Sequence, residues 1–140
     1  MLRGLRTLSV RLERQSLSAL KVAQWLEKRP EVARVVHPAL ASHPDHAIWK
    51  RDFTGASGVF SFQLNPTPDA RVKAMLEGFS IFAMGFSWGG YESLIVPSGK
   101  DIRRAVTKPP AEGALLRLSI GLEHPDDLIA DLEQGFARLA

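Results

Sequence analysis

Gly85-Phe86-Ser87-Trp88-Gly89-Gly90-Tyr91-Glu92-Ser93 places two adjacent glycines, a hydroxyl, an indole and a carboxylate between apolar segments. A glycine pair adopts backbone conformations closed to other residues and lets a ligand or another chain segment approach closely. A tight structural corner is the simpler interpretation of such a pair. A second unusual segment follows later, Leu115-Leu116-Arg117-Leu118-Ser119-Ile120-Gly121-Leu122-Glu123. We expect the two segments to meet at the edge of an active site whose remainder is missing from this chain.

The composition is that of one soluble globular domain. Of the 140 residues, 45% are hydrophobic and 24% are charged, as in ordinary soluble proteins. The net charge of +3 is too small to require a nucleic-acid partner. No apolar run approaches the ~20 residues of a membrane span, and the arginine-rich start is no secretory signal. The lack of cysteine excludes disulfides, thiolate catalysis and cysteine-bound zinc, and it fits a cytoplasmic protein.

Hydrophobic periodicity predicts strands interspersed with amphipathic helices. Short apolar or alternating runs predict strands over residues 32–36, 59–64, 93–96 and 115–120. Helical spacing and proline or capping signals predict helices over residues 2–29, 42–52, 67–79 and 101–106, and from 124 onward. Ser42 and Thr67 are expected as helix caps, and Lys108-Pro109-Pro110 as a rigid bend. This order predicts an α+β fold, a two-layer small domain with a mostly antiparallel sheet and helices on one face, preceded by a long N-terminal helix.

The long N-terminal helix is predicted from a single apolar stripe. Its members recur at spacings of three, four and seven residues: Leu5, Leu8, Leu12, Ala19, Ala23 and Leu26. Pro30 should end this helix, because the residue before a proline disfavours helical geometry. The basic residues mostly fall off the stripe, and a solvated face explains them more simply than a phosphate or membrane contact.

Three candidate chemistries find little support in the residues. Gly85-Phe86-Ser87-Trp88-Gly89 matches the nucleophile elbow of hydrolases, but that motif needs a helix after the turn, where a strand is predicted. His43 and His46 are spaced to share a metal ion, yet no third ligand is apparent. Lys100 and Lys108 lie in expected loops, without the desolvating pocket that a Schiff-base lysine needs.

Arg117 is the strongest candidate for a binding residue. A planar guanidinium can hold a carboxylate through two parallel hydrogen bonds, and a strand fixes its direction better than a loop. Strand alternation places Arg117 and Ser119 on the face opposite Leu116, Leu118 and Ile120. A bidentate pair would contribute about 1.5–3 kcal/mol. From spacing alone, an arginine on an exposed sheet face remains the simpler alternative.

A resemblance carried by these two segments favours the binding role of Arg117 over the exposed-arginine alternative. The sequence from Ser87 to Leu94, together with that from Arg117 to Glu123, resembles the C-terminal domain of the cystathionine β-lyases. These enzymes form a branch of the pyridoxal-phosphate-dependent Cys/Met metabolism family, which has fold type I. The likeness extends in order over essentially the whole chain, through the segments 2–8, 35–38, 58–62 and 126–132. Trp88 points to the β-lyase branch, because the γ-synthases and γ-lyases usually carry another residue there.

The resemblance implies roles for three site residues. Arg117 would bind the α-carboxylate of the substrate, Ser87 would assist through its backbone, and Trp88 through its indole nitrogen. The whole enzyme would use pyridoxal 5'-phosphate to convert the thioether amino acid cystathionine into homocysteine, pyruvate and ammonia. Cofactor-binding and metal-binding residues are not expected in this chain, because the Schiff-base lysine and the phosphate-binding loop of this family lie in the large domain.

The resemblance also implies a division into domains. Residues 1–30 would be the long connecting helix and residues 31–140 the small substrate domain, with the cofactor-binding large domain absent. We expect a truncated or separately expressed fragment that is inactive alone and that takes the large domain as its partner. The competing hypothesis is a non-catalytic module for dimerisation or interaction, with the apolar stripe as its contact surface. The substrate within the thioether amino acids and the formation of a homo-oligomer are left open.

Overall fold

A computed structural model describes residues 2–99, 105–106 and 113–140 of the protein. In chain order its elements are α1 (Leu2–Arg6), α2 (Leu8–Leu26), β1 (Val32–Val36), α3 (His46–Asp52), β2 (Val59–Leu64), α4 (Asp69–Glu77), β3 (Ala83–Met84), β4 (Leu94–Pro97), β5 (Leu115–Ser119) and α5 (Pro125–Phe136). The first two predicted strands are confirmed at their predicted bounds, and the other two to within one residue. Apart from residues 105–106, the helix predicted over 101–106 and the bend at 108–110 lie outside the described residues.

The strands form one sheet in the order β1-β2-β5-β4-β3. Every neighbouring pair is antiparallel except β3 and β4, which run parallel. Strand β5 lies in the middle, where Leu118 is paired with Phe60 of β2 and Ile95 of β4. These three side chains are buried in the core. The next residue back, Arg117, therefore stands on the opposite face of the sheet.

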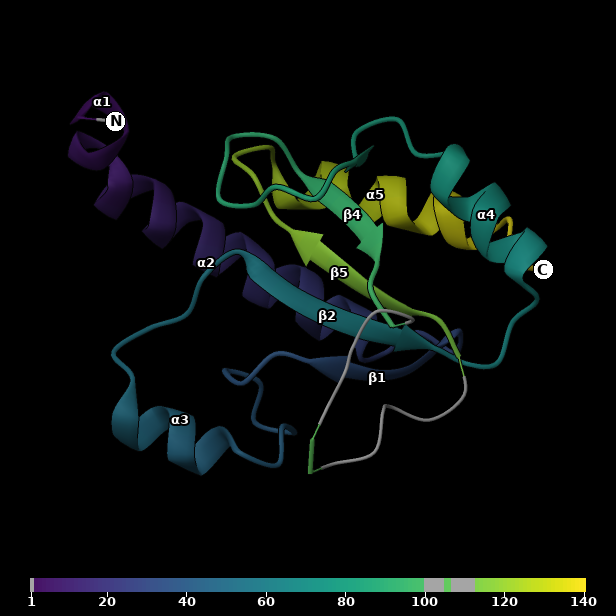
Figure 1. Ribbon diagram of the computed structural model, residues 1–140, viewed down its shortest axis with the longest axis horizontal. Helices are drawn as coiled ribbons and strands as arrows, with labels where there is room; N and C mark the ends of the chain where they lie inside the picture. The colour runs from purple at the N-terminus through teal and green to yellow at the C-terminus, as the bar shows by residue number, and fades with distance from the viewer. Residues whose placement is uncertain (1, 100–104, 107–112) are drawn as a thin grey trace.

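Helices α2 and α5 cover one face of the sheet, and α4 packs against α5 (Figure 1). In the same view α3 stands apart from the sheet, on the side of its edge strand β1. The core between the two layers includes Phe62, Leu64, Leu116, Leu128 and Leu132, all with no exposed surface. The predicted two-layer α+β fold, with a mostly antiparallel sheet and helices on one face, is confirmed. The helix that precedes the sheet belongs to its core, because the second half of α2 is part of the same cluster.

The prediction of one unbroken helix over residues 2–29 is right about the start at Leu2, but it misses a break at Thr7 and places the end three residues too late. Thr7 leaves helical geometry with φ −110° and ψ 8°, which separates α1 from α2. Its hydroxyl donates to the carbonyl of Gly4, which also accepts from the Arg11 guanidinium, and side-chain bonds of this kind compete with the helical backbone. At the other end α2 stops at Leu26, three residues before the position that Pro30 constrains.

The apolar stripe of the N-terminal helix is buried only in its second half. Ala19, Ala23 and Leu26 are fully buried, whereas Leu5 and Leu8 are 68% and 45% exposed. Helices α1 and α2 together thus extend an uncovered apolar edge past the sheet (Figure 1). Within the described ranges, no helix has both the length and the apolar character that a membrane crossing needs.

Two predicted helix caps are also wrong. The Ser42 hydroxyl donates to the carboxylate of Glu27, and α3 begins only at His46. The Thr67 hydroxyl donates to the carbonyl of Asn65 at 2.8 Å, and Pro68 occupies the position before α4. In both cases a hydroxyl found a partner outside the helix, so sequence position alone did not decide its role.

A buried carboxylate on α5 fixes the approach to the glycine-rich turn. Asp131 is only 4% exposed and accepts hydrogen bonds from the backbone N–H groups of Ser80, Ile81 and Phe82 at 2.8–3.0 Å. These residues lead directly into β3. A carboxylate with several backbone donors is well compensated for its burial. Asp131 therefore ties the helical layer to the edge of the sheet from which the turn starts.

Replacing Asp131 with alanine should lower the free energy of unfolding by about 3 kcal/mol, because three backbone N–H groups, the innermost of them buried, lose a charged acceptor. Urea denaturation measures this loss. Asp127→Ala is the matched control, since that carboxylate is exposed in the first turn of the same helix and should cost at most about 1 kcal/mol. Equal losses in the two variants would contradict the anchoring role of Asp131.

Candidate functional site

Arg117 is held against the backbone of the glycine-rich turn. Its Nη2 donates to the carbonyl of Phe86 at 2.9 Å and lies 3.2 Å from that of Ser87 and 3.4 Å from that of Gly85. The guanidinium carbon is 5.6 Å from the centroid of the Trp88 ring, within the range of a cation–π contact. The structure thus brings together the three residues that the resemblance singled out.

One donor atom of Arg117 remains unsatisfied. The Nε atom is buried and has no hydrogen-bond partner. Leaving a buried donor unpaired costs free energy, and the cost is larger for a charged group. A carboxylate is the acceptor that suits a guanidinium edge best. The turn carbonyls therefore hold the Arg117 guanidinium through Nη2, while its Nε has no hydrogen-bond acceptor.

The turn itself exposes its large side chains. Phe86, Trp88 and Tyr91 are 80%, 66% and 69% exposed, although they are aromatic. Gly89 has φ +74°, a left-handed conformation that favours glycine. A hydrogen bond to the Glu92 carboxylate and the charge of that group raise the pKa of the Tyr91 phenol, which keeps it neutral. The turn is followed by strand β4, so it does not have the strand-turn-helix form of a hydrolase elbow.

The segments 85–93 and 115–123 meet along a seam formed by Ser93 and Glu123. The Glu123 carboxylate accepts from the backbone N–H and the hydroxyl of Ser93, both at 2.8 Å. The Ser93 hydroxyl in turn accepts from the N–H of Gly121 at 2.9 Å. A Cβ at Gly121 would lie 2.2 Å from the carbonyl oxygen of Tyr91, so only glycine permits this approach. The seam fixes the far end of the turn to the end of β5.

Sequence reasoning missed the roles of Ser93 and Glu123, although both lie in the quoted segments. It also missed two polar residues at positions where the helical repeat calls for apolar ones. Gln15 falls on the stripe between Leu12 and Ala19, and Asp131 falls on the buried side of α5. A polar residue on a buried face needs a hydrogen-bond partner. This signal could have identified both residues.

The described residues offer no place for pyridoxal phosphate as a Schiff base. All four lysines among them are exposed: Lys21, Lys28, Lys50 and Lys73. A Schiff-base lysine has to be desolvated or placed beside another cation. Nor does any group of three metal-binding side chains occur in the described ranges; the Nδ1 atoms of His43 and His46 instead contact the Asp45 N–H and the Pro38 carbonyl.

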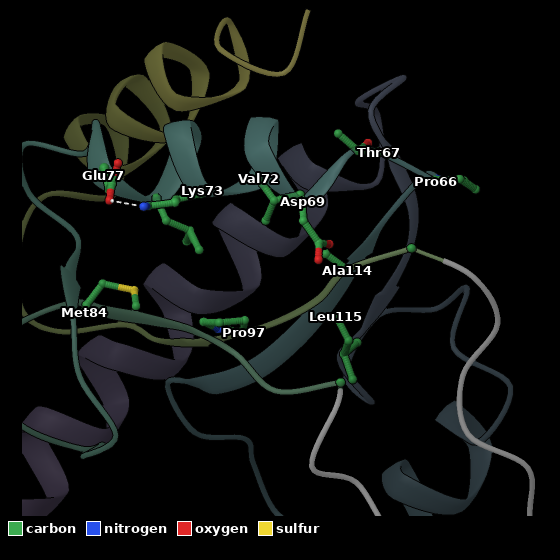
Figure 2. A pocket seen from close by; sticks show the side chains of 13 residues that line it. Pro66, Thr67, Asp69, Val72, Lys73, Glu77, Met84, Pro97, Ala114 and Leu115 are labelled. Atoms are coloured by element: carbon green, nitrogen blue, oxygen red, sulfur yellow. Dashed lines mark ion pairs between the residues drawn. The ribbon is translucent and has the colours of Figure 1, made fainter.

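A separate hollow of about 840 Å³ lies between α4 and the sheet. Figure 2 shows Val72 and Lys73 of α4 on one side, with Met84, Pro97 and Leu115 of three strands on the other. Lys73 is paired with Glu77 at 3.6 Å. Neither Arg117 nor the turn residues Ser87 and Trp88 line this hollow, so it is distinct from the Arg117 site.

Comparison with known proteins places this geometry in a family. The profile of the Cys/Met metabolism PLP-dependent enzymes matches residues 1–137. The cystathionine β-lyases of Salmonella typhimurium and Escherichia coli K12 are each 54% identical to this chain over 98% of its length, which is 36% of theirs.

A solved structure gives the same answer for the fold. The cystathionine γ-synthase of Xanthomonas oryzae superposes with a TM-score of 0.85 at 37% identity, covering 99% of this chain and 37% of that one. The chain thus spans about a third of the length of the relatives it matches. On this evidence the chain belongs to the family of Cys/Met metabolism PLP-dependent enzymes.

Proposed function

We propose that this chain is the C-terminal, substrate-carboxylate-binding domain of a PLP-dependent carbon–sulfur β-lyase. The reaction of the full-length enzyme would take cystathionine and water to homocysteine, pyruvate and ammonia. Residues 1–30 would connect to the large domain, and residues 31–140 would form the small domain. The Schiff-base lysine would be supplied by the part of the relatives that this chain does not span.

The observation that carries the proposal is the state of Arg117. Its Nη2 is fixed by the carbonyls of the turn, while its buried Nε has no partner. A substrate α-carboxylate would give this half-buried cation the charged acceptor that it lacks. The exposed indole of Trp88 stands beside the same guanidinium. It could donate to the second oxygen of that carboxylate, with the Ser87 backbone beside it.

The contribution of this chain to the reaction would be positional. Bound pyridoxal phosphate supplies the electron sink for the carbanion formed at Cα. Arg117, with Ser87 and Trp88, would hold the α-carboxylate and so set the angle of the Cα–H bond. Correct orientation of a reacting bond contributes to rate without any chemical step at the residues that provide it. The 140-residue chain alone is therefore expected to release no pyruvate from cystathionine with added pyridoxal phosphate.

The proposal can be tested in a chimera that joins this chain to the part of the Salmonella typhimurium enzyme it does not span. Arg117→Ala should raise the KM for cystathionine about ten- to hundredfold, because a charged hydrogen-bonded pair of about 1.5–3 kcal/mol is lost. Arg117→Lys should lie in between, since an ammonium keeps the charge and loses the bidentate geometry. Pyruvate release measures both effects.

Arg34→Ala serves as the control in the chimera, because Arg34 is an exposed cation on the edge strand β1. Its KM should equal that of the unaltered chimera. A chimera whose KM is insensitive to Arg117→Ala would refute the carboxylate role. Pyruvate release by the 140-residue chain alone would refute the proposal that the Schiff-base lysine comes from a part of the enzyme outside this chain.

The alternative function, a non-catalytic interaction module, is favoured by one observation. Leu2, Leu5, Leu8 and Val10 of α1 and α2 are 72%, 68%, 45% and 63% exposed, and several large exposed apolar side chains on one segment are a feature of interaction sites. Under this alternative, light scattering should show a self-associated chain that Leu5→Ser with Leu8→Ser returns to a monomer. Arg117→Ala should leave the association unchanged. A monomeric unaltered chain would remove this reason for the alternative.

A further inference from the structure

Two elements far from the turn in sequence hold its central peptides. The side-chain amide of Gln15, on α2, donates to the carbonyl of Gly90 at 2.6 Å. The hydroxyl of Ser119, on β5, accepts from the N–H of Gly89 at 3.1 Å. Gln15 and Ser119 are 3% and 1% exposed, whereas Gly89 and Gly90 are exposed, so each contact is buried on one side only. Breaking these bonds is costly, because the buried Gln15 amide and Ser119 hydroxyl cannot turn to solvent instead.

The position of Gln15 is built into the fold. Gly58, at the entry to β2, makes room for it, because a Cβ there would lie 3.2 Å from the Gln15 Cβ and 2.6 Å from the Ile120 carbonyl oxygen. One helical turn before Gln15, Arg11 donates to the carbonyl of Gly89 at 2.9 Å. Helix α2 thus presents two donors at an i, i+4 spacing to two consecutive carbonyls of the turn.

Burial of apolar surface does little to hold the turn where it is. Its three aromatic side chains, Phe86, Trp88 and Tyr91, are all more than half exposed. At its centre, Gly89 has no heavy atom within 4 Å of where a Cβ would stand. A turn with so little packing depends on its polar contacts for a single conformation.

We propose that Gln15 and Ser119 are positioning residues that set where Ser87 and Trp88 stand relative to Arg117. Ser119 lies two residues after Arg117 on the same face of β5, so one strand supplies both the cation and an anchor for the turn. Gln15 supplies the second anchor from the helical layer. The identity of the site as a carboxylate site rests on the proposed function. The holding of the turn by Gln15 and Ser119 is independent of that function.

Gln15→Met tests the proposal in the 140-residue chain, because it removes the donor and keeps the volume. By NMR, the Gly89 N–H should exchange with solvent about fivefold faster, the change that loss of one hydrogen bond of average strength allows. The Trp88 indole resonance should shift, and the heteronuclear NOE of residues 88–91 should fall. Ser18→Ala is the control: Ser18 is 3% exposed on the same buried face of α2, and its loss should leave all three signals in place.

Ser119→Ala provides a second test should Gln15→Met fail to fold, because it removes the acceptor of the Gly89 N–H from the opposite side. It should produce the same changes in the turn. Unchanged turn signals in the folded variants would overturn the proposal. Equal changes in Ser18→Ala would also overturn it, by tracing the effect to general loosening of the domain.

The chimera separates this proposal from the proposed function. Gln15→Met should raise the KM for cystathionine there by about fivefold, while the urea midpoint of the chain falls no further than in Ser18→Ala. Turn NMR signals that change with Gln15→Met would support the positioning contacts. If Arg117→Ala leaves the KM unchanged in the same chimera, the carboxylate site is refuted while the positioning contacts stand. A KM that rises with Arg117→Ala but stays unchanged with Gln15→Met would refute the positioning role alone.

Discussion

The alternation of side chains along β5 is the constraint on which the rest of the structure depends. This strand lies in the middle of the sheet, with Leu116 and Leu118 fully buried beneath the helices. Because the side-chain period of a strand is two, burying these leucines forces Arg117 and Ser119 to the other face. A slip of one residue would bury the guanidinium in the apolar core, which the burial cost of a charge forbids. The hydrophobic core therefore fixes the direction of the Arg117 guanidinium.

Polar groups, and not apolar contacts, fasten the glycine-rich turn to this frame. Asp131 holds the segment before the turn, and Glu123 with Ser93 holds the segment after it. Each of these carboxylates accepts from backbone N–H groups, and such bonds are both strong and directional. They set the turn accurately while leaving its aromatic side chains exposed. The turn is therefore both exposed and accurately placed.

Strands could be predicted from the sequence more reliably than helix ends. The runs at Val32–Val36 and Val59–Leu64 have β-branched and alternating apolar residues, and the structure keeps their bounds. Helix ends depended on which partner each hydroxyl found, either a nearby carbonyl or a carboxylate on another element. Thr7 bonded to Gly4 and interrupted the helix, while Ser42 bonded to Glu27 and capped nothing.

The sequence indicated which residues of the candidate site lie together, but not the residues that support them. Arg117, Ser87 and Trp88 carry recognisable motifs, and the structure brings them together. Gln15 and Ser119 act through pairings between residues 75 and 30 positions apart, which no local pattern encodes. The trace of Gln15 in the sequence is a polar residue among the leucines and alanines of α2, where the periodicity expects an apolar one.

Whether Trp88 lies against Arg117 can be tested directly by NMR. In the 140-residue chain, NOEs should join the ring protons of Trp88 to the side-chain protons of Arg117, since the guanidinium carbon lies 5.6 Å from the ring centroid. Adding an amino acid with a free α-carboxylate should shift both sets of resonances together. A spectrum in which the Trp88 ring shows no NOE to Arg117, in a chain that is otherwise folded, would contradict the half-site described above.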